Sequence, residues 1–255
     1  MKIDTTNKKV LIFSDVHQSW AHVNKIIKAE SADVNVCLGD WFDSFFYDDP
    51  EAVYETACTL ENFVMKPNCY TLWGNHDLQY FYPSKYTICS GYEPSKLAYL
   101  NEILGRNKVT VADKFRWYIQ IDDYICTHAG IHQHHLPAFF DTTDPISWLD
   151  HESKIGSIKV QSSEPFWFYT AGVARCGSAR RGGLVWLDFN DEFKGIRGLK
   201  QIVGHTSSRE NRIRGWKVNG ETPVQKWNNI CIDCHLAQYL VITNGKIEIK
   251  KFVDL

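Results

Sequence analysis

Residues 9–17 read KVLIFSDVH, and this stretch decides the fold. Its first five residues are a short run rich in apolar and β-branched side chains, which predicts a buried strand. Polar residues follow at once, with Asp15 and His17 among them. The same order recurs after the apolar runs 34–38 and 69–73, so three predicted strands each end in a polar motif.

Amphipathic helices are predicted between these strands. Residues 20–30 and 51–64 carry apolar side chains at helical spacing. The order strand–helix–strand–helix–strand is typical of an α/β fold with parallel strands. Ligands of open α/β sheets bind beyond the carboxyl ends of the strands. We therefore expect the polar motifs to face one crevice.

The second half of the chain is predicted to contain more strands, over residues 124–127, 201–204, 230–233, 238–243 and 246–252. Asn244-Gly245 between the last two is a strong hairpin signal. Residues 131–200 have an irregular pattern, and we expect helices and loops that cover the crevice. No repeat or linker interrupts the chain, so residues 1–255 are predicted to form a single domain with this insert at about 131–200.

The composition is that of a globular protein. Of 255 residues, 44% are apolar, and 28 basic and 30 acidic residues give a formal net charge of -2. These values exclude disordered and collagen-like chains and give no general attraction to nucleic acid or acidic membranes. No signal peptide and no apolar run of ~20 residues is seen. We expect a cytoplasmic protein without a membrane partner, whose eight cysteines are mostly reduced and buried.

Five polar motifs stand directly after predicted strands. They are Asp15-x-His17, Asp40-x-x-Asp43, Asn75-His76-Asp77, His128 and His205. Each motif alone is compatible with a turn, because Asp, Asn and Gly favour turns. Together they indicate a metal site, since carboxylate and imidazole ligands suit Mn, Fe or Zn. A bridging Asp, here Asp40, can hold two ions about 3.5–4 Å apart, the geometry of two-metal phosphoryl chemistry.

This set of motifs resembles the calcineurin-like metallophosphoesterase superfamily over residues 10 to about 245. The resemblance implies an α/β fold, a four-layer sandwich of two mixed β-sheets flanked by helices. It also implies two divalent metal ions, with Mn²⁺ favoured and Fe or Zn as alternatives. The implied ligands are Asp15, His17 and Asp40 for the first ion, and Asp40, Asn75, His128 and His205 for the second.

The resemblance also implies catalytic roles. His76 would act as the general acid on the leaving oxygen, and Asp43 would orient it. Asn75 would contact the substrate as well as the second metal.

Within the superfamily, the motifs are most similar to the phosphoprotein-phosphatase branch, which includes symmetrical diadenosine tetraphosphate hydrolases. Many phosphodiesterases and nucleases of the superfamily instead have Gly-His-x-His, and the second His corresponds to Ser207 here. The resemblance thus implies hydrolysis of phosphomonoesters or nucleotide phosphoanhydrides by metal-hydroxide attack. Its substrate would be a phosphorylated small molecule, a nucleotide or a phosphoprotein. One alternative is a phosphodiesterase or nuclease that acts on nucleic acid or cyclic nucleotides at the same site. A non-catalytic binding module is the other, and the intact ligand set argues against it.

Two positions depart from that branch. Arg usually follows the second Asp of Gly-Asp-x-x-Asp, but Ser44 stands here, before Phe45-Phe46-Tyr47. Asp77 stands where the branch often has Glu.

The expected replacement for the missing arginine is a later loop. We expect Arg175, Arg180 or Arg181 to bind phosphate, because arginine contacts phosphate in a planar, bidentate manner. A buried strand is expected directly after this loop, over 184–187.

Three other patterns in the sequence allow more than one interpretation. Cys231-Ile232-Asp233-Cys234-His235 matches the c-type haem attachment pattern, but without an export signal we expect no haem; a Cys231–Cys234 disulfide stays open. We expect His132, His134 and His135 at the surface, with contact to substrate as the alternative. The aromatic runs 41–47 and 166–169 are expected mostly in the core, with stacking on a nucleobase as the alternative.

Overall fold

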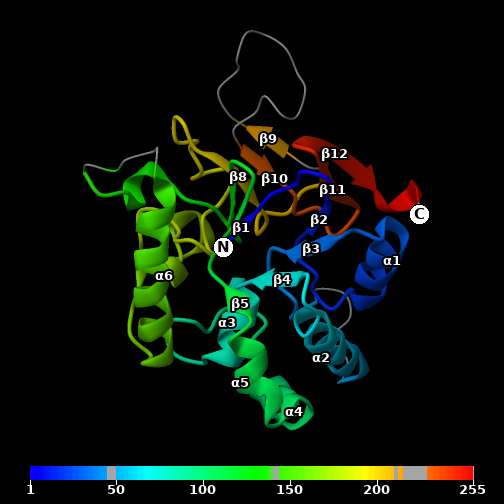
Figure 1. Cartoon of the computed structure of the whole chain (residues 1–255). Coiled ribbons are helices and arrows are strands. Elements are labelled where there is room, and N and C mark those ends of the chain that lie inside the picture. Colours follow the sequence, from blue (N-terminus) through cyan, green and yellow to red (C-terminus); the bar gives the residue numbers. More distant parts are fainter. Residues whose placement is uncertain (45–49, 139, 141–143, 210–211, 215–228, 255) are drawn as a thin grey trace.

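Two six-stranded β-sheets lie at the centre of the protein (Figure 1). The computed structural model describes residues 1–44, 50–138, 140, 144–209, 212–214 and 229–254. The strands of one sheet are, in spatial order, β12 (Lys246–Lys251), β11 (Gln238–Thr243), β2 (Lys9–Phe13), β3 (Val34–Cys37), β4 (Cys69–Leu72) and β5 (Phe115–Arg116). Those of the other are β1 (Lys2–Ile3), β6 (Ile119–Ile121), β7 (Tyr124–Cys126), β8 (Lys200–Val203), β10 (Asn229–Cys231) and β9 (Arg212–Arg214). Both sheets are mixed, because each contains parallel and antiparallel pairs.

The two sheets pack face to face. Val10 and Ile12 of β2 share an apolar cluster with Ile202 of the other sheet. Their neighbours Leu11 and Phe13 belong to a second cluster, which contains helix residues. Successive side chains of a strand point to opposite faces, so β2 is buried on both sides. That burial explains why its sequence is a nearly continuous apolar run.

Helices cover the outer faces of the sheets. They are α1 (Trp20–Glu30), α2 (Pro50–Val64), α3 (Asn75–Phe81), α4 (Pro94–Leu104), α5 (Asn107–Ala112) and α6 (Pro145–Gln161). In Figure 1, α1 and α2 lie on one side of the sheets and α6 lies on the other. The predicted fold, two mixed sheets flanked by helices, is confirmed. Within the described ranges, no helix is long and apolar enough to cross a membrane.

The predicted strands and helices named above are present within two residues at each end, with one exception. The Asn244-Gly245 hairpin is also present: Thr243 pairs with Lys246. Asn244 and Gly245 have φ angles of 49° and 73°, the left-handed values that a type I′ turn requires.

The predicted strand over 184–187 is wrong, because this segment is a turn. The Leu187 amide donates to the Gly183 carbonyl over 3.0 Å, and the Val185 amide donates to the Phe168 carbonyl over 2.9 Å. Leu184, Val185 and Leu187 are nevertheless buried. An apolar run of four residues therefore marks burial here without indicating the backbone conformation.

The segment between residues 131 and 200 contains α6 and three short 3₁₀ helices, η1 (Gln133–His135), η2 (Trp167–Tyr169) and η3 (Val173–Arg175). Helices and loops were expected there. Its role as an insert of one single domain stays a prediction. A further 3₁₀ helix, η5 (Phe252–Asp254), follows β12.

Candidate metal centre

Several predicted site residues have an unusual backbone conformation. Positive φ angles are found at Asp15 (55°), His17 (42°), Asp40 (57°), Asp43 (64°) and His205 (67°). Residues other than glycine seldom adopt this left-handed conformation, and it collects at functional sites. Asp15, Asp40 and His205 lie two or three residues beyond the ends of β2, β3 and β8, and His17 and Asp43 follow in the same loops.

A first group of candidate ligands comprises Asp15, His17 and Asp40, whose ligand atoms all lie within 4.8 Å of one another. Nε2 of His17 lies 4.0 Å from Oδ1 of Asp15 and 3.8 Å from Oδ2 of Asp40. Nδ1 of His17 lies 2.8 Å and 3.1 Å from the carbonyls of Asp43 and Phe42. Those carbonyls engage Nδ1, so the ring presents Nε2 to the two carboxylates.

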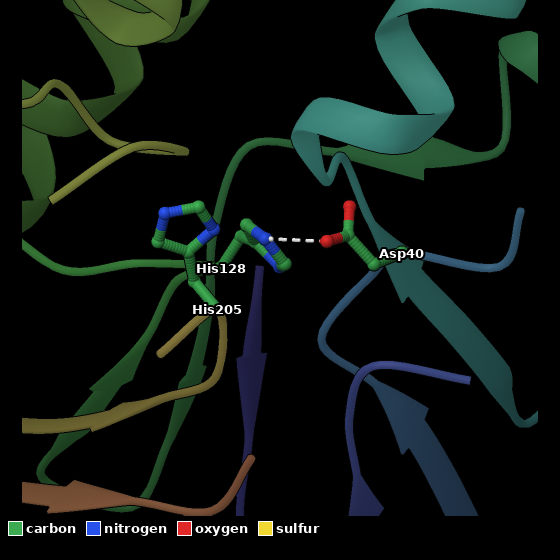
Figure 2. A group of neighbouring side chains, drawn as sticks. All are labelled: Asp40, His128 and His205. Carbon is green, nitrogen blue, oxygen red and sulfur yellow. Dashed lines mark ion pairs between the residues drawn. The ribbon is translucent and has the colours of Figure 1, made fainter. Parts of the chain in front are cut away.

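A second group comprises Asp40, His128 and His205, also within 4.8 Å. Nε2 of His128 lies 3.3 Å from Oδ2 of Asp40, and Figure 2 shows this ring between Asp40 and His205. The same Nε2 lies 3.2 Å from Oδ1 of Asn75. Nδ1 of His128 lies 2.8 Å from the Leu38 carbonyl, which again leaves Nε2 directed to the site. The structure thus brings all six predicted ligands to one place, and Asp40 belongs to both groups.

The charges of the site favour a bound cation. Burial would raise the pKa of Asp40, but His128 and His76 outweigh it and lower that pKa well below its ordinary value. Burial lowers the pKa of His128, but Asp40 more than compensates and raises it to about 10. Burial raises the pKa of Asp15 to about 6, against the charge of His128. Negatively charged carboxylates that are buried here are stabilised by a nearby positive charge, and a divalent cation would supply that charge.

One buried atom fits a metal directly. Nε2 of His205 is buried and has no hydrogen-bond partner among the described residues. Burial, together with His128 and Arg175, lowers the pKa of His205 well below its ordinary value, so the ring is neutral. A neutral imidazole is the form that binds a metal. The donor set of imidazole nitrogens and carboxylate oxygens fits Mn, Fe or Zn.

A buried network surrounds Asp43. Its Oδ2 lies 2.8 Å from Nδ1 of His76, and its Oδ1 accepts hydrogen bonds from Tyr80 (2.5 Å) and Lys96 (3.2 Å). Gln79 also donates to Oδ2. Burial lowers the pKa of His76, but Asp40 and Asp43 outweigh it, and the pKa is raised.

Sequence reasoning missed Gln79, Tyr80 and Lys96. The first two follow His76 by three and four residues on α3, and helical spacing could have found them. Lys96 lies on α4, and no local pattern connects it with Asp43.

Asp77 has a structural role next to the site. Its two carboxylate oxygens accept hydrogen bonds from the backbone amides of Asp40 and Trp41 at 2.8 Å and of Gly74 at 3.1 Å. Asp77 is fully buried. It therefore fixes the turn that carries Asp40 to the start of α3, the helix that carries Asn75 and His76.

The three predicted phosphate-binding arginines differ in position. Nε of Arg175 lies 2.8 Å from Oδ2 of Asp188, and its charge acts on His205. Arg180 is exposed. Arg181 is half-buried and its charge acts on His132. Of the three arginines, Arg175 is therefore the one that we relate to a candidate metal ligand, His205.

The region of the missing arginine is only partly described. The Ser44 amide donates to Oε1 of Gln18 over 2.6 Å. The neighbouring Phe45-Phe46-Tyr47 lies outside the described residues.

The histidines after His128 only partly match the prediction of surface placement. His134 is exposed. His132 is buried at 9% exposure, and His135 is half-buried and stacks on Trp167 at 4.6 Å. The surface expectation is therefore wrong for His132, whose Nδ1 accepts a hydrogen bond from the His134 amide and which lies close enough to Arg181 to feel its charge.

The Cys231–His235 segment lies beside the first ligand group. Burial, together with Asp15, raises the pKa of Asp233 to about 7. Both cysteines are buried free thiols. Cys231 donates to the Gly204 carbonyl and Cys234 to the Gln238 carbonyl.

Comparison with known proteins agrees with this geometry. A family model described as calcineurin-like phosphoesterase matches residues 8–206. The fold is similar to that of a cold-active protein-tyrosine phosphatase of a psychrophilic Shewanella species, with 16% identity, a TM-score of 0.59 and coverage of 98% of this chain and 80% of that one. A protein serine/threonine phosphatase from Saccharomyces cerevisiae has 11% identity and a TM-score of 0.54, with coverage of 98% and 83%. No curated protein matches the chain. From the family match, this chain belongs to the calcineurin-like phosphoesterase family of hydrolases.

Proposed function

We propose that this protein is a phosphatase that hydrolyses phosphomonoesters or nucleotide phosphoanhydrides with two divalent cations. The observation that supports it is the shared position of Asp40 in both ligand groups, with the His76–Asp43 pair directly beside it. Asp15 and His17 would complete the first cation site. The donor set favours Mn²⁺, with Fe and Zn as alternatives.

When bound, two such cations polarise phosphoryl oxygens and supply hydroxide at neutral pH. The remaining steps fall to side chains of the chain. Asp43 would hold Nδ1 of His76, so that the Nε2 proton goes to the leaving oxygen. Asn75 would complete the second cation site with His128 and His205 and contact the substrate.

We propose that Arg175 supplies the phosphate contact that Ser44 does not. Arg175 is paired with the buried Asp188, which positions its guanidinium, and its charge reaches His205. Arg180 and Arg181 are the weaker candidates, because their charges are not directed to the ligand groups in the described contacts.

A monoesterase is favoured over a diesterase or nuclease. Ser207, which stands where many diesterases of the superfamily have a second His, is exposed. The formal net charge of -2 provides no general attraction to a nucleic-acid backbone.

The test is a substrate panel with metal analysis. The protein is loaded with Mn²⁺, Fe²⁺ or Zn²⁺ and assayed on an alkyl phosphate, p-nitrophenyl phosphate, bis(p-nitrophenyl) phosphate, diadenosine tetraphosphate and single-stranded DNA. We expect two ions per chain and higher kcat/KM for the monoesters or the tetraphosphate. Faster cleavage of the diester or of DNA would instead establish the phosphodiesterase alternative. Two bound ions without any hydrolysis would contradict both.

A further inference from the structure

A cavity of about 230 Å³ opens between residues 85–88 and the segment 165–186. Four of its lining residues are aromatic, and three have polar side chains. The lining includes Tyr86, Phe166, Tyr169 and Trp186, with Lys85 and Ser178 at the polar side. None of these residues belongs to the ligand groups or to the Asp43 network.

Two lining residues connect the cavity with His205 and Asn75 of the metal centre. The Trp186 ring packs edge-to-face on His205, with centroids 5.4 Å apart and an interplanar angle of 79°. Ile88 also lines the cavity and directly precedes Cys89, whose sulfur lies 3.7 Å from Nδ2 of Asn75. The cavity therefore borders His205 through Trp186 and lies near Asn75 through the Ile88-Cys89 segment, which makes it the candidate site for the ester group of a substrate bound at the metal centre.

The chemistry of the walls favours a flat, apolar ring. Aromatic side chains bind another ring by stacking or edge-to-face contact. The lining residues include no Asn, Gln, Asp or Glu among the described ones. The Thr170 hydroxyl already donates to the Phe166 carbonyl over 3.0 Å.

A nucleobase carries donors and acceptors that need partners when buried, and leaving them unpaired is costly. A phenyl ring has no such requirement. Lys85, the one charged residue among those that line the cavity, is exposed and lies 5.0 Å from the Tyr86 ring centroid. It adds a cation at the entrance, which suits an anionic substrate.

We propose that this cavity is a leaving-group pocket that selects aryl phosphomonoesters, such as tyrosine phosphate. The inference rests on the proposed phosphatase function. During hydrolysis, the attacking water would first lose a proton to solvent, and the oxygen of the resulting hydroxide would form the new bond to phosphorus. The P–O bond to the ring breaks, its electron pair stays on the phenolic oxygen, and that oxygen receives the proton of His76. The ring remains in the pocket until the phenol dissociates.

The experiment compares two phosphopeptides of identical sequence, one with phosphotyrosine and one with phosphoserine, and adenosine monophosphate as a third substrate. Because a phenol is intrinsically the better leaving group, the readout is the change in the kcat/KM ratio in a variant rather than the ratio itself. Tyr86→Leu should lower kcat/KM for phosphotyrosine about fivefold to tenfold, the worth of one aromatic contact. Phosphoserine hydrolysis should change by less than about twofold.

Trp186→Leu is the second variant, with metal content measured because Trp186 contacts His205. Tyr54→Leu on α2 is the matched control, since Tyr54 is 45% exposed and does not line the cavity. An unchanged phosphotyrosine-to-phosphoserine ratio in both pocket variants would overturn the pocket but leave the phosphatase function intact. A selective loss on adenosine monophosphate would assign the pocket to a nucleobase and overturn the aryl proposal. No hydrolysis of any ester by protein with two bound ions would overturn the function and the pocket together.

Discussion

Nδ1 of His76 lies 2.8 Å from Oδ2 of Asp43, and both residues are buried. Asp43 cannot turn away, because Tyr80 and Lys96 bind its other oxygen. The imidazole is therefore held by Nδ1, and Nε2 is the nitrogen that can meet a leaving oxygen. The side chains of His76 and its neighbour Asn75 thus have different partners: His76 contacts Asp43, whereas Asn75 lies beside His128. We therefore propose a catalytic role for His76 and a metal-binding role for Asn75.

We predict that His76→Asn keeps its metal content and loses a factor of about 10²–10⁴ in kcat, the usual worth of general acid catalysis. The loss should be smaller for p-nitrophenyl phosphate than for an alkyl phosphate, because nitrophenolate leaves without a proton. His151→Asn, at an exposed position of α6, is the control. Wild-type turnover of the alkyl phosphate by His76→Asn would refute the role of His76.

The second prediction concerns the shared ligand. Asp40→Ala should lose both ions, because Asp40 is the one residue present in both ligand groups. Asp15→Ala should weaken only the first site and retain one ion. Metal content per chain after dialysis measures both. Full retention of one ion in Asp40→Ala would show that the two sites do not share this carboxylate.

The third prediction concerns the phosphate contact. Arg175→Ala should lower kcat/KM by the worth of a charge-assisted hydrogen bond, about 1.5–3 kcal/mol, with metal content unchanged. Arg180→Ala and Arg181→Ala should lower kcat/KM less than Arg175→Ala does. The three losses together rank the contributions of the three arginines. Ser44→Arg in the Arg175→Ala background should recover part of the loss. If all three single variants keep full kcat/KM, this loop does not bind the phosphate.

The fourth prediction concerns Glu192, whose carboxylate binds the backbone on both sides of the segment 175–181. This buried carboxylate accepts hydrogen bonds from the amides of Ala174 (3.1 Å) and Gly182 (2.7 Å). Glu192→Ala should lower Tm, since each buried amide left unpaired costs about 1–3 kcal/mol. It should also lower kcat/KM by displacing Arg175.

A double-variant cycle distinguishes positioning from a general loss of stability. In the Arg175→Ala background, Glu192→Ala should lower kcat/KM little further, because the contact is already absent. Fully additive losses would mean that Glu192 acts on the site by another route.

The extent of prediction from sequence can be seen at β2. The apolar run 9–13 and its polar ending predicted both the central strand and the position of Asp15 and His17, because burial on two faces leaves a local signature. The same reasoning failed over 184–187, where an equally apolar run is a turn held by Gly183. Local hydrophobicity reports burial, whereas the conformation here is fixed by the local hydrogen bond to Gly183 together with the hydrogen bond from the Val185 amide to the distant Phe168 carbonyl.

The candidate site shows the same contrast between residues with a local sequence signal and residues placed by the tertiary fold. Its candidate ligands follow strand ends and could be found in the sequence, whereas Lys96 reaches Asp43 from 53 positions away through the packing of α4. The difference between Arg175 and Arg180 likewise depends on Asp188, whose position follows from the tertiary fold. Such contacts have no spacing that a sequence pattern could reveal.

The last prediction concerns pH. The ring of His135 stacks on Trp167, and burial, with His132 and His134 adding to it, lowers the pKa of His135 to about 3. The unfolded chain has an ordinary histidine pKa near ~6.5. Between these values, the unfolded state binds a proton that the folded state does not, so this histidine makes the folded state less stable as pH falls below ~6.5.

We therefore expect His135 to contribute a decrease in the Tm of the wild type on acidification from about pH 7.5 to about pH 5, whatever the other titrating groups add. His135→Gln should have a lower Tm at the higher pH, because the ring stacking is lost, but a smaller decrease between the two pH values. His151→Gln, at an exposed position, should show the wild-type decrease. Other groups that titrate contribute equally to all three proteins, so the difference between their decreases isolates His135. An identical decrease in His135→Gln and the wild type would show that His135 does not take up a proton on unfolding.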